Sequence, residues 1–350
     1  MSPTGPKEGG HMETSMEGDV FVQTNAAHNE VIAYSRDATG MLTHVGTFAT
    51  GGAGNDEAHL PSQGSVTLTR DRRHLLVTNV ASRDVSVFSL EGPMPALTKT
   101  VPTGMAPRSV AEHNGLVFVL ATGDARIDGF RLVDGDLVPI EGSSMALSTP
   151  DGAQVGFTPD GGALIVTERG ADKLSAFAVG MDGSLGAART IDSSGPTPYG
   201  FAFAMNGTLV VTEAFRAEKG AAAASSYRVD GDAITPVTAS VGNGRSEICW
   251  AVISNDGRYA FTTNFADGAV SRYAIASDGT LTLEEAVAGL TTEGQPGLRD
   301  EDLSDDGAFL YAIDADQGRI VGWSVDDHGH LSMLGVWEGV PVTVAGLAAR

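Results

Sequence analysis

Polar residues end successive apolar runs at intervals of 43–54 residues along the chain, as in a repeat protein, and some of them can move protons. Glu168 and Glu213 each end an apolar run, and a carboxylate at such a place can activate water against a carbonyl carbon. Arg108 begins another apolar run and can hold a carboxylate or an oxyanion. Asp300 lies in the charged run 299–302, where neighbouring carboxylates can raise one pKa and produce a general acid or base. These four residues are the candidate catalytic residues.

Four further residues are candidates for contact with a substrate. Tyr199 and Trp250 can stack on a flat or sugar-like ligand, although an aromatic residue of the core fits the same pattern. Gln154 occupies the same repeat position as Arg108, and His59 comes shortly before an apolar run.

The sequence indicates no cofactor. It contains no histidine and cysteine spacing typical of zinc, no phosphate loop and no dinucleotide-binding glycine motif. A divalent cation held by Asp300 together with Glu168 or Glu213 is the weaker alternative. We therefore expect no metal and no nucleotide cofactor.

A repeated unit organises these candidates. Each unit has an apolar strand, a turn that often contains Asp-Gly or Asn-Gly, a second apolar strand and two further alternating strands. The leading pair of strands is clear at 65–79, 154–168, 200–213, 250–264 and 300–314, and a weaker copy lies at 108–122. A copy without its leading strand opens the chain at 20–25, and a lone leading strand closes it at 343–349.

Seven such units predict an all-β fold, a seven-bladed β-propeller with four-stranded antiparallel blades. The two half units predict that the C-terminal strand joins the N-terminal blade and closes the ring. We expect a disordered tail at residues 1–18 and one propeller domain at 19–350.

The propeller explains how residues far apart in sequence can meet. The start of each leading strand and the end of each second strand lie at the same end of the central channel. Alignment on the turns places one ring of side chains at the leading-strand starts: Ser65, Arg108, Gln154, Gly200, Trp250 and Asp300. A second ring lies at the second-strand ends: Asn25, Asn79, Thr122, Glu168, Glu213, Asn264 and Asp314. The first ring is chemically varied, as in a ligand pocket, but a water-filled channel lining fits it too. Most of the second ring is explained by side-chain turns.

Charge and cysteine content indicate which classes of partner and which cellular compartment suit the protein. With 22 basic and 44 acidic residues the formal net charge is −22, which disfavours nucleic acids and anionic membranes. The single cysteine, Cys249, cannot form an intrachain disulfide and favours a cytoplasmic location. No apolar stretch is long enough for a transmembrane helix. We expect a small-molecule substrate.

Residues 156–186, 197–215 and 248–283, with the closing VAGLAAR, resemble the seven-bladed propeller lactonase family of phosphogluconolactonase-like and carboxymuconate-lactonising-like proteins. The resemblance covers residues 19–350. It implies a propeller that hydrolyses, forms or isomerises a lactone or a related hydroxy acid.

Two family segments differ here. Members with lactonase chemistry carry P-H-x-H before the leading strand of a middle blade and D-L-G-x-D after its second strand. This chain has TPDGAQVGF and TERGAD at those places, so the histidines are absent. Because a shared fold does not determine a reaction, this departure argues against the phosphogluconolactonase reaction. The main hypothesis is a lactonase-like hydrolase, with a lyase or isomerase second. The alternative is a non-catalytic propeller that binds a ligand or a protein partner.

Overall fold

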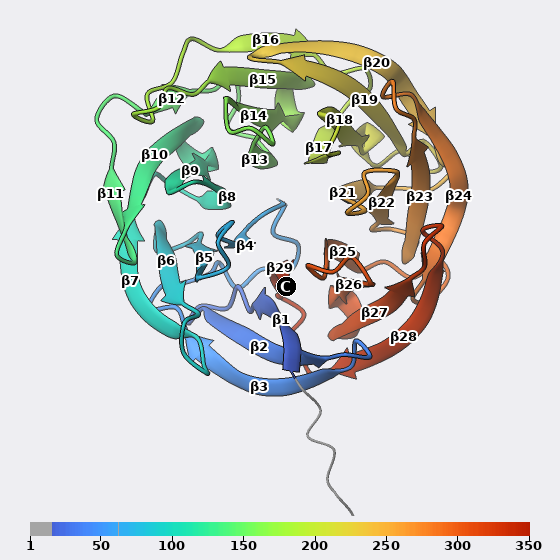
Figure 1. Cartoon of the computed structure of the whole chain (residues 1–350), viewed down its shortest axis with the longest axis horizontal. Helices are drawn as coiled ribbons and strands as arrows, with labels where there is room; N and C mark the ends of the chain where they lie inside the picture. The colour runs from blue at the N-terminus through green and yellow to red at the C-terminus, as the bar shows by residue number, and fades with distance from the viewer. Residues whose placement is uncertain (1–15, 62) are drawn as a thin grey trace, which may run out of the picture.

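The computed structural model describes residues 16–61 and 63–350, which form a ring of seven β-sheets around a central channel (Figure 1). The predicted seven-bladed, all-β propeller is confirmed. The first strand begins at Met16, inside the predicted tail, and the rest of that tail lies outside the described residues. No helix among the described residues is long and apolar enough to cross a membrane.

The first four blades, each read from the channel outward along its main strand path, are as follows. Blade 1 contains β29 (Ala345–Ala349), β1 (Met16–Gln23), β2 (Glu30–Asp37) and β3 (Leu42–Ala49). Blade 2 contains β4 (Val66–Leu68), β5 (His74–Asn79), β6 (Asp84–Ser89) and β7 (Ala96–Pro102). Blade 3 contains β8 (Pro107–His113), β9 (Leu116–Ala121), β10 (Arg126–Val133) and β11 (Asp136–Pro139), and β12 (Met145–Ala146) also pairs with β10. Blade 4 contains β13 (Gln154–Phe157), β14 (Ala163–Glu168), β15 (Lys173–Ala178) and β16 (Arg189–Asp192).

The other three blades follow the same order. Blade 5 contains β17 (Pro198–Phe203), β18 (Thr208–Glu213), β19 (Ala223–Asp230) and β20 (Ala233–Gly242). Blade 6 contains β21 (Ile248–Ile253), β22 (Tyr259–Asn264), β23 (Ala269–Ile275) and β24 (Leu281–Leu290). Blade 7 contains β25 (Leu298–Leu303), β26 (Phe309–Asp314), β27 (Arg319–Val325) and β28 (Leu331–Glu338). Short 3-10 turns lie at η1 (Thr122–Asp124), η2 (Arg169–Ala171), η3 (Phe215–Ala217) and η4 (Ala315–Gln317).

The ring closes as the half units predicted. Strand β29 pairs antiparallel with β1, with Phe21 opposite Ala348 and Val22 opposite Leu347. Because β29 belongs to the C-terminus and the other strands of blade 1 to the N-terminus, this pairing joins the two ends of the described chain. It also pairs the inner edge of β1, which would otherwise be open.

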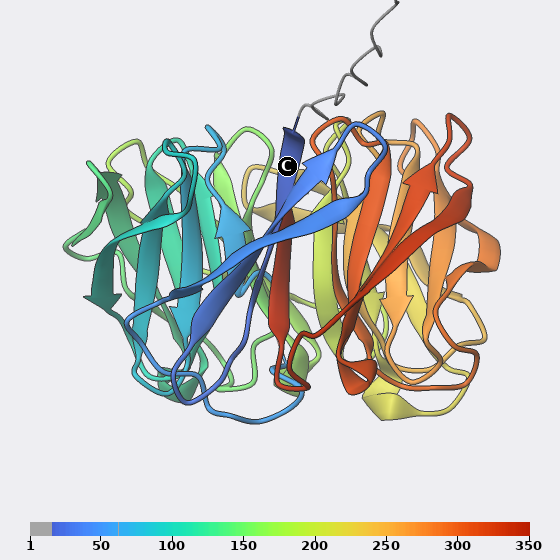
Figure 2. The same ribbon diagram turned by 90° about the horizontal axis from the view of Figure 1, so that it is seen from below.

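The hydrophobic core lies between neighbouring blades. One cluster joins Val20 and Ile32 of blade 1 to Tyr311 and Ile313 of blade 7, and another joins Leu76 of blade 2 to residues of blade 3. Successive side chains of a strand point to opposite faces of the sheet, so both faces of each twisted sheet pack against a neighbouring blade. The blades therefore stand side by side around the channel (Figure 2).

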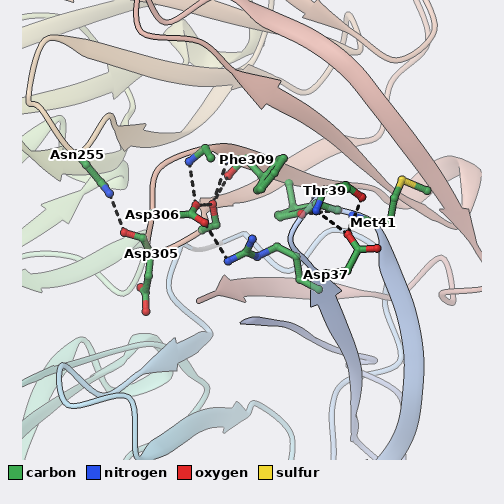
Figure 3. Close-up of polar contacts among 12 residues, drawn as sticks. Asp37, Thr39, Met41, Asn255, Asp305, Asp306 and Phe309 are labelled. Carbon is green, nitrogen blue, oxygen red and sulfur yellow. Dashed lines mark hydrogen bonds and ion pairs between the residues drawn. The ribbon is translucent and has the colours of Figure 1, made fainter. Parts of the chain in front are cut away.

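Aspartates of the hairpin turns stabilise the face that carries the chain ends. The Asp37 carboxylate accepts hydrogen bonds from the backbone N–H groups of Thr39 and Met41, at 2.8 and 3.0 Å (Figure 3). Asp306 forms an ion pair with Arg36 at 3.2 Å, which links blade 7 to blade 1. These acids serve turns and blade contacts, which accounts for part of the large negative charge.

Candidate functional site

A cavity of about 360 Å³ lies at the end of the channel where leading strands begin and second strands end. This end is opposite the hairpin-turn face described above. The cavity lies mainly among blades 4 to 7, and the β3–β4 loop covers one side. Its lining consists of His59, Leu60, Pro61, Arg169, Thr197, Tyr199, Ala214, Arg216, Ala217, Glu247, Cys249, Trp250, Phe265 and Arg299. Of the eight predicted site residues, His59, Tyr199 and Trp250 line it.

A β-bulge at the start of four leading strands, β8, β17, β21 and β25, affects which side chains face the cavity. In β17, Pro198 pairs with Glu213 and Phe201 with Val211, so two residues on one strand oppose one on the other. The same shift occurs in β8, β21 and β25. The paired residues make Arg108 equivalent to Tyr199, Cys249 and Arg299, one position away from Trp250 and Asp300. The predicted register for Arg108 was therefore wrong by one residue, because β8 and β9 meet in a tighter turn, with His113 opposite Leu116, than the leading strand pairs of blades 5 to 7.

Arg299 is the most deeply buried charge of the cavity wall, with a side chain only 1% exposed. Its Nη2 lies 2.8 Å from Nδ1 of His59 and 3.7 Å from Oδ1 of Asp316. Its guanidinium carbon lies 5.3 Å from the centre of the Phe265 ring. Neither Nε nor Nη1 has an acceptor among the described residues. Burial lowers the pKa of Arg299, and a buried, partly unpaired guanidinium favours an anion beside it.

His59 lies beside Arg299 on the β3–β4 loop and is half exposed. Burial, and then the positive charge of Arg299, lower its pKa, so the ring is neutral near pH 7. Since Arg299 donates to Nδ1, the proton of the neutral ring belongs on Nε2, which lies 3.8 Å from Asp316. His59 can therefore donate a hydrogen bond in this cavity, and it is poorly arranged to act as a base.

Glu247 supplies the carboxylate of the cavity lining. It immediately precedes β21, with a left-handed φ of 55°. Burial, and then the negative charge of Asp267, raise its pKa above the ordinary value. Its carboxylate forms no ion pair among the described residues. A partly buried, unpaired carboxylate with a raised pKa is suited to general base catalysis.

Aromatic rings and a second arginine form another part of the wall. Tyr199 and Trp250 meet edge to face, with ring centres 5.6 Å apart. The guanidinium of Arg169 lies over Tyr199 at 5.2 Å and donates to Asp151 at 2.6 Å. Arg216, at the rim, forms an ion pair with Asp172. Arg169 and Arg216 each have a close carboxylate partner, whereas the Asp316 carboxylate lies 3.7 Å from Arg299.

The loop that follows β18 brings Arg216 and Ala217 to the cavity. Phe215, Arg216 and Ala217 all have positive φ values, of 47°, 52° and 61°. Arg216 N donates to Oγ1 of Thr197 at 3.0 Å, which helps hold this strained turn. The longer connection in the fifth blade is therefore part of the cavity wall.

Glu168 and Glu213 do not line the cavity. Glu168 is buried and accepts hydrogen bonds from Ser148 N at 2.6 Å and Ser175 Oγ at 2.5 Å. Glu213 is buried and accepts from Gly195 N at 2.8 Å and Ser240 Oγ at 2.7 Å. Each carboxylate holds the loop that enters its own blade, so the two do not share the channel mouth as expected. No three histidine, cysteine or acidic side chains among residues 16–61 and 63–350 are grouped to hold a metal.

Arg108, Gln154 and Asp300 lie outside the cavity lining. Burial, and then the charge of Arg169, lower the pKa of Arg108, whose Nε has no acceptor among the described residues. The side-chain oxygen of Gln154 accepts from Phe201 N at 2.6 Å, which joins the leading strands of blades 4 and 5. Burial raises the pKa of Asp300 to about 7, and the Trp250 side chain donates to its carboxylate. Asp300 thus lies directly behind the cavity wall.

Gln63 separates the cavity from the rest of the channel. Its Nε2 donates to Ala251 O at 3.0 Å, and its Oε1 accepts from Ala251 N at 3.1 Å. Its own backbone N–H donates to Ala153 O at 3.1 Å. The loop before β4 reaches into the centre of the ring (Figure 1), so Gln63 connects blades 4 and 6 across the channel. A second cavity, of about 310 Å³, lies beyond it and is lined in part by Arg72, Asp302 and Asp305.

Several cavity residues were not among the predicted ones. Arg299 and Cys249 each come one residue before a member of the aligned ring, Asp300 and Trp250, and both line the cavity. Glu247 stands one residue before a leading strand, where a glutamate is indistinguishable from a loop residue. Arg169 follows Glu168 directly, and this adjacency was the available signal.

The structure is thus a seven-bladed β-propeller with a cavity at one end of its channel that several arginines line. The profile of the family described as "Lactonase, 7-bladed beta-propeller" matches residues 2–215 and 213–336. The chain belongs to this family, as its sequence motifs indicated.

Solved structures at low sequence identity share the fold. A protein from Lactobacillus plantarum has a TM-score of 0.76 and 18% identity, covering 95% of this chain and 99% of its own. A structure titled "putative 6-phosphogluconolactonase", from Bacteroides uniformis, has a TM-score of 0.74 and 18% identity, covering 95% and 100%. A Pseudomonas aeruginosa periplasmic gluconolactonase has a TM-score of 0.71 and 17% identity, covering 95% and 98%. No curated protein matches the chain.

Proposed function

We propose that this protein is a lactonase-like hydrolase that opens an anionic lactone in the cavity at the channel mouth. The family and the named lactonases among the similar folds support this class of reaction. The observation that carries the proposal is that one cavity contains both Arg299, which is buried and partly without acceptors, and Glu247, which forms no ion pair. The arginine provides an anion site, and the carboxylate provides a base.

Glu247 acts as the general base. Its ionised carboxylate accepts a proton from water while the water oxygen bonds to the lactone carbonyl carbon. Collapse of the tetrahedral intermediate breaks the bond to the ring oxygen, which takes the proton back from Glu247. The product is the hydroxy acid, and Glu247 returns to its ionised form.

Arg299 holds the anionic group of the substrate through its guanidinium, which lines the cavity. Arg169, which lies over Tyr199 and also lines the cavity, stabilises the oxyanion that forms at the carbonyl. The neutral His59 holds Arg299 in place through Nδ1. Each of these groups is fixed before the substrate arrives, so the site needs little reorganisation.

The test is hydrolysis of a panel of carboxylated and neutral lactones, followed as acid release at constant pH. We expect Glu247→Gln to lower kcat by about 100-fold or more, because it removes the base while keeping the shape of the side chain. We expect Arg299→Gln to raise KM for carboxylated lactones about tenfold or more. Arg73→Gln and Glu338→Gln, which change exposed residues of the outer surface, are the matched controls.

Full turnover by both Glu247→Gln and Arg299→Gln would refute these assignments. Binding of carboxylated lactones without turnover by the wild-type protein would favour the alternative, a non-catalytic propeller that binds ligands.

A further inference from the structure

The outer strand of each blade has one edge that no other strand of the described chain covers. Such an edge presents unpaired backbone N–H and C=O groups, and soluble proteins protect it with charged residues or proline, which oppose pairing with another chain. The main outer strands are β3, β7, β11, β16, β20, β24 and β28, and six of these seven carry such protection. The protecting residues are Lys99 and Pro102 in β7, Asp136 and Pro139 in β11, Arg189 and Asp192 in β16, Pro236 in β20, Glu284 and Glu285 in β24, and Glu338 in β28.

Strand β3 is the exception. Its eight residues, LTHVGTFA, include no acidic residue, no lysine or arginine and no proline. It lies on the outside of blade 1, away from the channel, between the outer strands of blades 2 and 7 (Figure 1). A β-bulge interrupts β3, but β7, β20, β24 and β28 have bulges as well, so a bulge does not distinguish it. The edge of blade 1 is therefore open to pairing with a further strand.

Exposed apolar side chains lie on both sides of β3. On the side of blade 2, the Met94 side chain lies beside Gly46 of β3. On the side of blade 7, the Met41 side chain lies beside Gly335 of β28. We call β3 and its five exposed apolar neighbours the β3 strip. These neighbours are Met41, Met94, Leu97, Met333 and Val336.

The charge of the protein indicates what can pair with this strip. Each chain has a formal net charge of −22, so two copies repel each other when charged surfaces approach. The strands β3, β7 and β28 together contain two charged residues, Lys99 and Glu338, and Lys99 forms an ion pair with Asp136 at 3.2 Å. Two copies can therefore approach at the β3 strip with little repulsion. A strand edge is also complementary to itself, because a two-fold axis places the donors of one copy opposite the acceptors of the other.

We propose that the β3 strip is a dimer interface, at which β3 of one copy pairs antiparallel with β3 of a second copy. The pairing joins the two four-stranded first blades into one continuous sheet and removes the open edge from both. Because the contact uses the same surface of each copy, association stops at the dimer. An interface of one strand and a few side chains is small, so we expect a Kd of about 1–50 µM. The cavity at the channel mouth plays no part in this contact.

The test is sedimentation velocity of the full-length protein at concentrations from about 1 to 200 µM, over which the wild type should change from one chain to two. Thr47→Lys places a like charge on both sides of the paired strands and should raise Kd about tenfold or more. Thr235→Lys is the matched control, because Thr235 is also exposed on an outer strand, β20, and this variant should dimerise as the wild type does. Both variants lower the net negative charge equally, so a difference between them reports on the β3 strip.

Salt and amide exchange give a second test that does not depend on a variant. Raising the ionic strength from about 0.02 to 0.5 M should lower Kd about threefold or more, because salt screens the repulsion between the two copies. Amide hydrogen exchange in β3 should be slower at high protein concentration than at low, with no such change in β20.

Three outcomes would overturn the proposal. They are a wild-type protein that stays monomeric at about 200 µM in high salt, a dimer that Thr47→Lys does not weaken and whose β3 amides exchange as in the monomer, and growth of the wild type beyond the dimer.

Discussion

Asp300 should make the stability of the protein depend on pH in a way that one substitution removes. Its side chain is buried, 3% exposed, and lies in the channel behind Trp250. Burial is the dominant cause that raises its pKa to about 7, against an ordinary value of 3.8. Trp250 and the Gly346 backbone donate to the carboxylate, but Oδ2 has no partner among the described residues. The folded state therefore favours the protonated acid.

The sign and size of the effect follow from these values. Because the pKa is higher in the folded protein, the stabilising contribution of protonated Asp300 is complete below about pH 4. It is lost progressively as the pH rises, until the group is ionised in both states above about pH 7. Between pH 5 and pH 8 this loss amounts to about 2–3 kcal/mol. For a domain of this size the loss corresponds to about 3–5 °C in Tm.

Asp300→Asn removes the ionisation and keeps the shape of the side chain. Its oxygen can accept from Trp250, and its amide group can occupy the unpaired side. We expect the unfolding free energy of the variant, minus that of the wild type, to increase by about 2–3 kcal/mol between pH 5 and pH 8. The other buried acids titrate in both proteins and cancel in this difference.

The assay is urea unfolding at several pH values, followed by tryptophan fluorescence. Asp327→Asn, at an exposed turn, is the control and should give a difference that does not change with pH. A pH-independent difference for Asp300→Asn, or one that decreases as the pH rises, would refute the inference that Asp300 is buried in its protonated form.

Three further predictions concern other parts of the site. Glu213→Ala should lower the unfolding free energy by about 2–4 kcal/mol, because it leaves Gly195 N and Ser240 Oγ without an acceptor. Activity per folded molecule, measured by titration of active sites, should be unchanged. Gln63→Ala should weaken ligand binding several-fold through the loss of both contacts to Ala251, and unaltered calorimetric affinity would show that the bridge does not support the cavity. In the wild type, kcat/KM should rise with pH on the acid side of its profile, because Glu247 has the raised pKa and must ionise to act. This rise should disappear in Glu247→Gln and persist in His59→Gln. Loss of the rise in His59→Gln instead would assign the base to the histidine.

The architecture could be predicted from the sequence because propeller repeats are local and regular. Alternating apolar residues define the strands, and Asp-Gly and Asn-Gly pairs mark the hairpins. The half copies at 20–25 and 343–349 can complete a blade only by pairing with each other, and this predicted that the two ends of the chain close the ring. The first strand extends three residues beyond the predicted domain start, because an edge of a strand carries little hydrophobic signal.

The site was harder to predict, because it depends on local changes in strand register that the repeat pattern of the sequence does not reveal. The bulges at the leading-strand starts shift the cavity-facing position by one residue, which exchanges Asp300 for Arg299 in the wall. Glu168 and Glu213 were predicted to be catalytic because they are glutamates at turn positions, yet nearby serines and loop N–H groups satisfy both carboxylates. Those serines lie on the two outer strands of the blade and in the loop that enters it, so the partnership is visible only after folding.

The central claim is that the cavity at the channel mouth binds an anionic ligand through Arg299. The most direct measurement is calorimetric titration of phthalide-3-carboxylate, a carboxylated lactone, into the wild-type protein, Arg299→Gln and the surface control Arg73→Gln. The structure predicts a loss of affinity of about tenfold or more for Arg299→Gln, with no change for Arg73→Gln. Equal affinity for the wild type and Arg299→Gln would contradict the claim.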